Sequence, residues 1–265
     1  MPSVATDDIA AALRAIEDDG YVVLENAISS ATAGELAESV LQAPDRTAGV
    51  KGYFFTANLL NHDRGFVDLI LHPSVLAIAR HLLGGRTVEA PNAFAWPEAD
   101  QVRLGTIDGL VAGPGCEPGW WHQDSPMGQL NPARPLPDFP IIVNFLWMLT
   151  PFTEQTGATR VKPHSQHYRK LPSPSQQKLD DQVLCCGEPG SVVVIPNTVW
   201  HASGGNQSNK PRVAAACFYQ PWWTGRFHKD VYPVRKEIWQ TLPPDAQALT
   251  KHHLEWNTDY HGDLL

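Results

Sequence analysis

Two histidines and one aspartate of this chain have the spacing of a metal-binding set. His122 and Asp124 stand two residues apart, so in an extended segment their side chains point to the same face. With His201 they supply two imidazole nitrogens and one carboxylate oxygen, which occupy one face of an octahedron and leave the other positions open. This arrangement suits Fe(II) that must also bind oxygen and a further ligand. Because the chain has 11 histidines, the spacing alone also fits ordinary hydrogen-bonding surface residues.

The residues around His201 favour the metal site. A β-branched run at 191–195 predicts a buried strand, and the stretch 204–211, rich in Gly, Asn and Ser, predicts a turn. Arg212 is followed by an apolar run, and together they predict the return strand of a hairpin. This hairpin would bring Arg212 close to His201. An arginine fork matches a carboxylate with two hydrogen bonds, and Ser203 adds a hydroxyl, so this mouth of a sheet suits a dicarboxylate cosubstrate. Taken alone, Arg212 also fits a solvent-exposed charge at a sheet edge.

Four segments resemble the phytanoyl-CoA dioxygenase (PhyH-like) family of Fe(II)/2-oxoglutarate-dependent oxygenases. They occur in the family's order at 15–28, 122–124, 154–167 and 201–212, and so extend over most of the chain. The most specific part is the distal histidine, followed two residues later by a serine and eleven residues later by an arginine. The resemblance implies a jelly-roll fold and the cofactors Fe(II), 2-oxoglutarate and O2.

The resemblance also implies site roles and a reaction. Iron would be bound by His122, Asp124 and His201, and the distal carboxylate of 2-oxoglutarate by Arg212 and Ser203. The cosubstrate would be converted to succinate while an unactivated C–H bond is oxidised, with hydroxylation as the expected outcome. Desaturation, rearrangement or epoxidation with the same cofactors stays open, and so does a cupin-like isomerase or binding protein that does not use 2-oxoglutarate. The aspartate disfavours chlorination, because halogenating relatives carry a small residue there.

One segment departs from the family pattern. Where relatives read Pro-Gly-Ser-His, this chain reads Pro-His-Ser-Gln-His at 163–167. We interpret His164 and His167 as loop residues, or residues behind the ligands, rather than as iron ligands. The proline-rich stretch 131–140 cannot form regular helix or central strand, so we expect a loop beside the metal that acts as a substrate lid or as a rigid connector.

Further residues are candidates for lining the site. Asn144 is polar among apolar strand positions and would bind the cosubstrate or substrate, or else pair with a backbone group. Trp121 and Trp200 stand next to ligands and should point away from the metal. The Trp, Phe and Met residues suggest a mostly apolar small molecule, and the family resemblance implies a role in natural-product tailoring, that is, secondary metabolite biosynthesis. The candidates are Asn144 and Thr159 for the cosubstrate, and Trp120, Met148, Trp222 and Trp223 for the substrate.

The order of predicted elements indicates a mainly β fold with flanking helices. Helical spacing covers 7–18 after a capping sequence, resumes from Ser29 or Ser30 to about Leu41, and returns over 66–83. Helices first and strands afterwards favour helices packed on a sandwich or barrel, and with the resemblance a double-stranded β-helix (jelly roll, cupin-like) core. The predicted strands are 21–24, 87–95, 101–108, 141–150, 183–185, 191–195 and 213–220.

Composition limits the remaining possibilities. The chain has 265 residues, a net charge of −8 and 43% hydrophobic residues. We expect one domain, 1–265, with a helical part to about 85, a core over about 86–225 and a tail over about 226–265. The acidity argues against a nucleic-acid partner, and the longest apolar runs are too short to cross a membrane. We expect a cytoplasmic enzyme with a small-molecule substrate and four free cysteine thiols, as monomer or homodimer.

Overall fold

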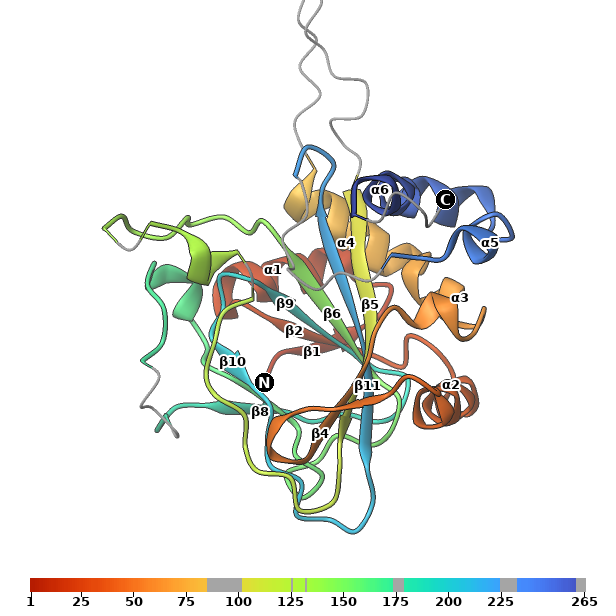
Figure 1. The fold of residues 1–265 in the computed structure, drawn as a ribbon. Helices are drawn as coiled ribbons and strands as arrows, with labels where there is room; N and C mark the ends of the chain where they lie inside the picture. The colour runs from red at the N-terminus through yellow and green to blue at the C-terminus, as the bar shows by residue number, and fades with distance from the viewer. Residues whose placement is uncertain (85–101, 125, 132, 174–178, 225–232, 261–265) are drawn as a thin grey trace, which may run out of the picture.

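Two β-sheets form the centre of the molecule (Figure 1). The structure, a computed structural model, describes residues 1–84, 102–124, 126–131, 133–173, 179–224 and 233–260. Within these residues the larger sheet has eight strands, antiparallel except for the pair β1–β2, and the smaller sheet has three. The larger sheet runs, in spatial order, β1 (Ser3–Ala5), β2 (Val22–Glu25), β9 (Val192–Pro196), β6 (Val143–Met148), β11 (Arg212–Pro221), β5 (Val102–Ala112), β4 (Tyr53–Thr56) and β3 (Thr47–Ala48). The smaller sheet runs β10 (His201–Ala202), β7 (Thr159–Val161) and β8 (Val183–Cys185).

The larger sheet is covered on both faces. All six residues of β6 are buried, which is typical of a strand with packed layers on either side. Phe145 and Trp147 point outward and join the core beneath the helices, whereas Leu146 and Met148 point inward and pack with side chains of the smaller sheet. Figure 1 shows β10 and β8 on the opposite side of the larger sheet from α2 (Ser30–Gln42) and α3 (Phe66–Ile70). The space between the two sheets is therefore the interior of the barrel.

The N-terminal helices begin and end where the sequence predicts. Helix α1 (Ile9–Asp19) starts after Asp8, whose side chain accepts a hydrogen bond from the Ala11 N–H at 2.9 Å, and ends at Gly20 with a φ of 94°. The predicted helix over 66–83 is two helices, because Pro73 lacks an N–H and opens α4 (Pro73–Leu83) rather than continuing α3.

The C-terminal part adds α5 (Lys236–Trp239) and α6 (Pro244–Tyr260). No helix in the described part of the chain is both long and apolar enough to cross a membrane.

Two expectations about the strands need correction. The region before residue 85, predicted to be helical apart from one strand, also contributes β1, β3 and β4 to the larger sheet. The predicted hairpin between His201 and Arg212 is wrong: β10 pairs with β7 in the smaller sheet, whereas β11 pairs with β5 and β6 in the larger one. The amide of Asn206 donates to the carbonyls of Ala112 and Lys210, and so holds the connection where it crosses between the sheets. The predicted strand 87–95 lies outside the described residues.

The other strand predictions are confirmed with small shifts at their ends, and all four cysteines are free thiols as expected. The loop over residues 131–140 has no helix or strand in its described part, in agreement with its prolines. Leu136 exchanges hydrogen bonds with Arg169: its N–H donates to the Arg169 carbonyl at 3.0 Å, and its carbonyl accepts from Arg169 Nε at 2.9 Å. These two hydrogen bonds restrain the loop at Leu136.

Two adjacent histidines anchor α6 against β5. His253 Nε2 lies 2.9 Å from the Leu104 carbonyl, and its Nδ1 accepts from the Val234 N–H at 3.3 Å, so this ring is neutral and satisfied at both nitrogens. The His252 ring is 2% exposed and packs edge-on against it at 4.7 Å between ring centres. Burial, with the His253 ring and Arg103, lowers the pKa of His252 to about 2.

Acid should therefore weaken this attachment. Below about pH 6.5 the unfolded chain protonates His252 but the native protein does not, so native stability falls with falling pH. Between about pH 6 and 4, we expect the free energy of unfolding of the wild type to drop more steeply than that of His252→Leu, by up to about 1.4 kcal/mol per pH unit. Urea denaturation at each pH measures this slope, and His81→Leu, at an exposed histidine, is the control. Parallel curves for wild type and His252→Leu would contradict the prediction.

Candidate metal and cosubstrate site

The two histidines of the predicted metal set are held together by their backbones. His122 and His201 form an antiparallel bridge, and each N–H donates to the other's carbonyl at 3.0 Å. Facing residues of such a pair carry their side chains on the same side, and the two imidazole rings lie 4.3 Å apart between centres. Strand pairing thus brings together two histidines that are distant in sequence.

Hydrogen bonds direct one nitrogen of each ring toward the site. His122 Nδ1 lies 3.0 Å from the Trp120 carbonyl and His201 Nδ1 lies 3.0 Å from the Val199 carbonyl, so in the neutral rings Nδ1 carries the proton. The lone pairs of both Nε2 atoms then remain available. Nε2 of His122 is 3.8 Å from one Asp124 carboxylate oxygen, and Nε2 of His201 is 3.6 Å from the other.

The donor set fits a divalent iron ion. Ligand atoms of the two histidines and Asp124 all lie within 4.8 Å of one another. Burial lowers the pKa of His201, but the Asp124 carboxylate outweighs this effect and the net shift is upward. Burial and the neighbouring His201 ring lower the pKa of His122, which favours the neutral ring that a metal requires. Two neutral nitrogens and one hard oxygen are the ligands of Fe(II) sites with open positions.

Arg160 of β7 forms hydrogen bonds with both chain segments that carry the site histidines His122 and His201. Its Nη2 donates to the Gly119 carbonyl at 2.8 Å and its Nε donates to the Ser203 carbonyl at 3.2 Å. The guanidinium carbon also lies 5.0 Å from the centre of the Trp121 ring. Gly119 lies just before His122 in the sequence and Ser203 just after His201, so Arg160 supports the positions of both histidines.

Loss of this support should weaken metal binding. We expect Arg160→Met to lower the affinity for Ni(II), measured by calorimetry, about tenfold, because the imidazoles lose part of their fixed geometry. Arg169→Met is the control, since that arginine is 46% exposed and contacts the loop at Leu136 and Asp138. Unchanged nickel affinity in a folded Arg160→Met variant would show that the ligand segments hold their positions without it.

Arg212 is buried between the sheets without a carboxylate partner. It shares the inner face of β11 with Ala214 and Ala216, and it is 3% exposed. Its guanidinium carbon lies 4.7 Å from the centre of the Phe152 ring, Nε makes no hydrogen bond, and no carboxylate of the described residues pairs with it. Burial lowers the pKa of Arg212, and Tyr53 opposes this shift. Because a buried cation without a counter-charge is costly, this position fits an anion such as a carboxylate.

The remaining predicted cosubstrate residues also lie between the sheets. Asn144 follows the inner-face pattern of Leu146 and Met148, is 5% exposed, and has a buried Oδ1 without a hydrogen-bond partner. Thr159 is buried on β7, on the same face as Val161 of the inner cluster. These positions suit contacts with a bound ligand, and their roles stay predictions.

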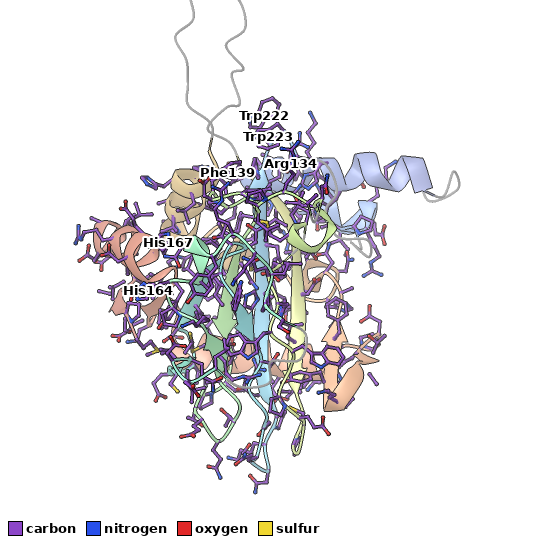
Figure 2. All side chains as sticks on the ribbon, turned by 90° about the vertical axis from the view of Figure 1, so that its left-hand side faces the viewer. Arg134, Phe139, His164, His167, Trp222 and Trp223 are labelled. Carbon is purple, nitrogen blue, oxygen red and sulfur yellow. The ribbon has the colours of Figure 1, made fainter. Side chains whose placement is uncertain are left out.

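The predicted substrate residues are spread over different places. Met148 is fully buried in the inner apolar cluster. Trp120 is 58% exposed, has the Lys51 ammonium 5.0 Å from its ring centre, and lines a separate cavity of about 510 Å³ beside Arg160. Trp222 and Trp223 follow the end of β11. They lie at the same end of the molecule as Arg134 and Phe139, two exposed residues of the 131–140 loop (Figure 2). Their contacts with substrate stay predictions.

The expected orientation of the other aromatic residues is confirmed. Trp121 and Trp200 are 4% and 5% exposed and pack together with Ala202, away from the metal donors. His164 and His167 lie at the surface (Figure 2), and neither belongs to the donor set found in the described residues. His164 Nδ1 lies 2.9 Å from the Asp18 carbonyl at the end of α1, which agrees with its interpretation as a loop residue.

Sequence reasoning missed two residues near the site, Tyr53 and Arg160. Tyr53 lies on β4, which was not predicted, although the run Tyr-Phe-Phe-Thr that begins there has the aromatic composition of a strand. Arg160 stands inside one of the four family-like segments, but alternation along β7 turns it away from the ligands. Tyr53 could have been recognised only if residues 53–56 had been predicted to form a strand next to β5.

Solved structures with this fold include two metal- and 2-oxoglutarate-bound enzymes. HygX from Streptomyces hygroscopicus, with nickel, 2-oxoglutarate and hygromycin B bound, has a TM-score of 0.62 at 15% identity and covers 82% of this chain and 89% of its own. The epimerase SnoN, in complex with Fe3+, alpha ketoglutarate and nogalamycin RO, has a TM-score of 0.60 at 16% identity and covers 80% and 83%. The expected fold, mainly β with flanking helices and a double-stranded β-helix core, is confirmed.

Among sequence relatives, dioxygenase andF of Emericella variicolor is 31% identical over 100 residues, which are 38% of this chain and about a third (34%) of that protein. Dioxygenase trt7 of Aspergillus terreus is 24% identical over 255 residues, covering 90% and 82%. Uncharacterized protein Rv1501 of Mycobacterium tuberculosis is 25% identical over 264 residues, covering 96% and 88%.

Fold and donor set together define the class of protein, an Fe(II)- and 2-oxoglutarate-dependent dioxygenase. The chain belongs to the phytanoyl-CoA dioxygenase (PhyH) family, whose model matches residues 16–214. Its cofactors are accordingly Fe(II), 2-oxoglutarate and O2, as the sequence predicts.

Proposed function

We propose that this enzyme hydroxylates an unactivated C–H bond of a mostly apolar small molecule in a biosynthetic pathway. Iron is held by His122, Asp124 and His201, and the distal carboxylate of 2-oxoglutarate by Arg212 and Ser203. The observation that carries the proposal is Arg212: a buried guanidinium without a carboxylate partner among the described residues, on the face of β11 that looks into the barrel. The buried guanidinium requires an anion, and the donor set fits a metal. A cosubstrate with a carboxylate at one end and a metal-binding keto acid at the other matches both.

The protein residues have three tasks in this proposal. The carbonyls of Trp120 and Val199 hold the two imidazoles in one tautomer, so that Nε2 of each faces the metal position. Arg212 orients the cosubstrate through its distal carboxylate and neutralises that charge. The apolar side chains between the sheets, such as Leu146 and Ala216, exclude water. Bound iron supplies the oxygen chemistry.

Two features support the choice of reaction and substrate. Asp124 keeps a carboxylate at the position that halogenating relatives leave small, so we propose hydroxylation rather than chlorination. Two of the relatives are fungal proteins named dioxygenases, and two structural neighbours bind nogalamycin RO or hygromycin B. These likenesses favour a natural-product-like small molecule over a nucleic acid. We propose that the whole chain works as one domain. Its cytoplasmic location and its state as monomer or homodimer stay predictions.

Anaerobic binding of 2-oxoglutarate tests the proposal without knowledge of the substrate. We expect the Fe(II)-loaded protein to bind 2-oxoglutarate and to develop the visible charge-transfer absorption of an iron-keto acid complex. The metal-free protein is the control and should show no such band. Admission of air should then release succinate. A loaded protein that does not bind 2-oxoglutarate would refute the proposal and favour a cupin-like isomerase or binding protein.

A further inference from the structure

We propose that Tyr53 is a positioning residue of the cosubstrate site, which joins Arg212 and Ser203 into one pocket for the distal carboxylate. This inference rests on the proposed function, because it assumes that these two residues hold 2-oxoglutarate. Neither the sequence nor the family resemblance assigns Tyr53 a role.

Strand register places Tyr53 beside Arg212. Tyr53 pairs with Ala112 on β5, and Ala112 pairs with Arg212 on β11, so the three residues form one row across the larger sheet. Paired residues share a face, and the side chain between the two long ones is only a methyl group. Tyr53 and Arg212 are therefore neighbours on the inner face. Tyr53 also acts on Arg212 electrostatically, because it opposes the lowering of the Arg212 pKa that burial causes.

The phenol is suited to hold several groups at once. Its O–H donates to the Gly204 carbonyl at 2.7 Å. Burial raises the pKa of Tyr53 to about 12, although Arg212 and Ser203 oppose the shift, so the phenol keeps its proton at neutral pH. With that proton committed to Gly204, the oxygen lone pairs can accept from Arg212 and from Ser203. One hydroxyl thus links a strand of the larger sheet with the segment that follows β10.

The Gly204 carbonyl is a fixed anchor. A Cβ at Gly204 would lie 2.5 Å from the Ala158 carbonyl oxygen, and a Cβ at Gly157 would lie 2.7 Å from the Gly204 carbonyl oxygen. Only glycines permit this approach, so the loop after β10 packs directly on the backbone that precedes β7. Ser203 precedes this anchor, and its own carbonyl is bound by Arg160. Tyr53 consequently connects its position beside Arg212 in the sheet with the segment that carries Ser203.

The test replaces Tyr53 by Phe, which removes the hydroxyl and keeps the ring. Tyr219→Phe is a matched control: its hydroxyl donates to the Ile70 carbonyl, also at 2.7 Å, from the opposite, helix-facing side of the same sheet. The wild type and both variants are loaded with Ni(II), which binds without turnover. Each protein is then titrated calorimetrically with two ligands. One is 2-oxoglutarate, and the other is 2-oxovalerate, which has the same keto acid end but a methyl group in place of the distal carboxylate.

We expect Tyr53→Phe to raise the Kd of 2-oxoglutarate about tenfold, the size of one hydrogen bond to a charged group, and that of 2-oxovalerate less than about twofold. Tyr219→Phe should change neither Kd, and nickel affinity should stay the same in both variants. Equal weakening of both ligands in Tyr53→Phe would overturn the inference, because it would indicate a general structural effect. An unchanged Kd for 2-oxoglutarate would overturn it as well. Failure of the wild-type protein to bind 2-oxoglutarate would instead refute the proposed function itself.

Discussion

Replacement of Asp124 by Ala is expected to lower iron affinity at least about a hundredfold and to abolish succinate release. In the proposed site Asp124 would supply the one anionic ligand, and its two oxygens face the two histidine rings at 3.8 and 3.6 Å. Changes to groups that merely orient ligands cost ten- to a hundredfold in metal affinity, so loss of a ligand should exceed that range. Metal content after dialysis and calorimetric titration with Ni(II) measure the effect.

Asp181→Ala is the control for this prediction. Asp181 is 68% exposed and pairs with Lys162, away from the donor set. We expect it to keep wild-type metal content and turnover. Thermal unfolding of the metal-free proteins should place both variants near the wild type, because Asp124 belongs to no hydrophobic cluster of the core. A metal-replete, active Asp124→Ala variant would remove Asp124 from the site.

Arg212→Met is expected to raise the Kd of 2-oxoglutarate at least about a hundredfold while leaving nickel affinity within about threefold. The change keeps the length of the side chain but removes a charge-assisted, two-pronged partner of the carboxylate. The ligand-free variant should be no less stable than the wild type, since burial of an unpaired cation is itself unfavourable. Calorimetry with nickel first and 2-oxoglutarate second separates the two affinities.

Arg160→Met provides the contrast to Arg212→Met. Both arginines are buried, but Arg160 donates to the Ser203 carbonyl whereas Arg212 faces the barrel interior. We expect the Arg160 variant to lose metal affinity and the Arg212 variant to lose cosubstrate affinity. If Arg212→Met lowered both affinities equally, Arg212 would be a structural residue and the proposed cosubstrate pocket would be wrong.

Local patterns in the sequence predicted most elements correctly. Asp8 and Gly20 bound α1 as capping rules require, and the β-branched run before Pro196 forms β9. The short strands β1, β3, β4, β7 and β10 were not predicted, because strands of two to four residues carry little periodicity. Their existence depends on neighbours that lie far away in the sequence.

The donor set likewise depends partly on local sequence and partly on contacts between distant segments. His-x-Asp and a distant histidine could be recognised in the sequence, but their approach depends on a backbone bridge between two chain segments. The predicted hairpin failed for a related reason: a turn-rich sequence indicates that the chain bends, not which strand it meets next. Arg212 nevertheless reached the interior, since alternation along β11 is a local property.

The sequence by itself determined the kinds of chemical groups available: two imidazoles, a carboxylate, an arginine and a serine, in the order typical of one enzyme family. Those residue types and their alternation are local, so they can be read without a structure. The tertiary structure alone decided that Tyr53 stands beside Arg212, that Arg160 lies behind the ligands, and that the strands bearing His201 and Arg212 belong to different sheets. These relations follow from strand register and from burial between layers, and both depend on the whole chain being folded.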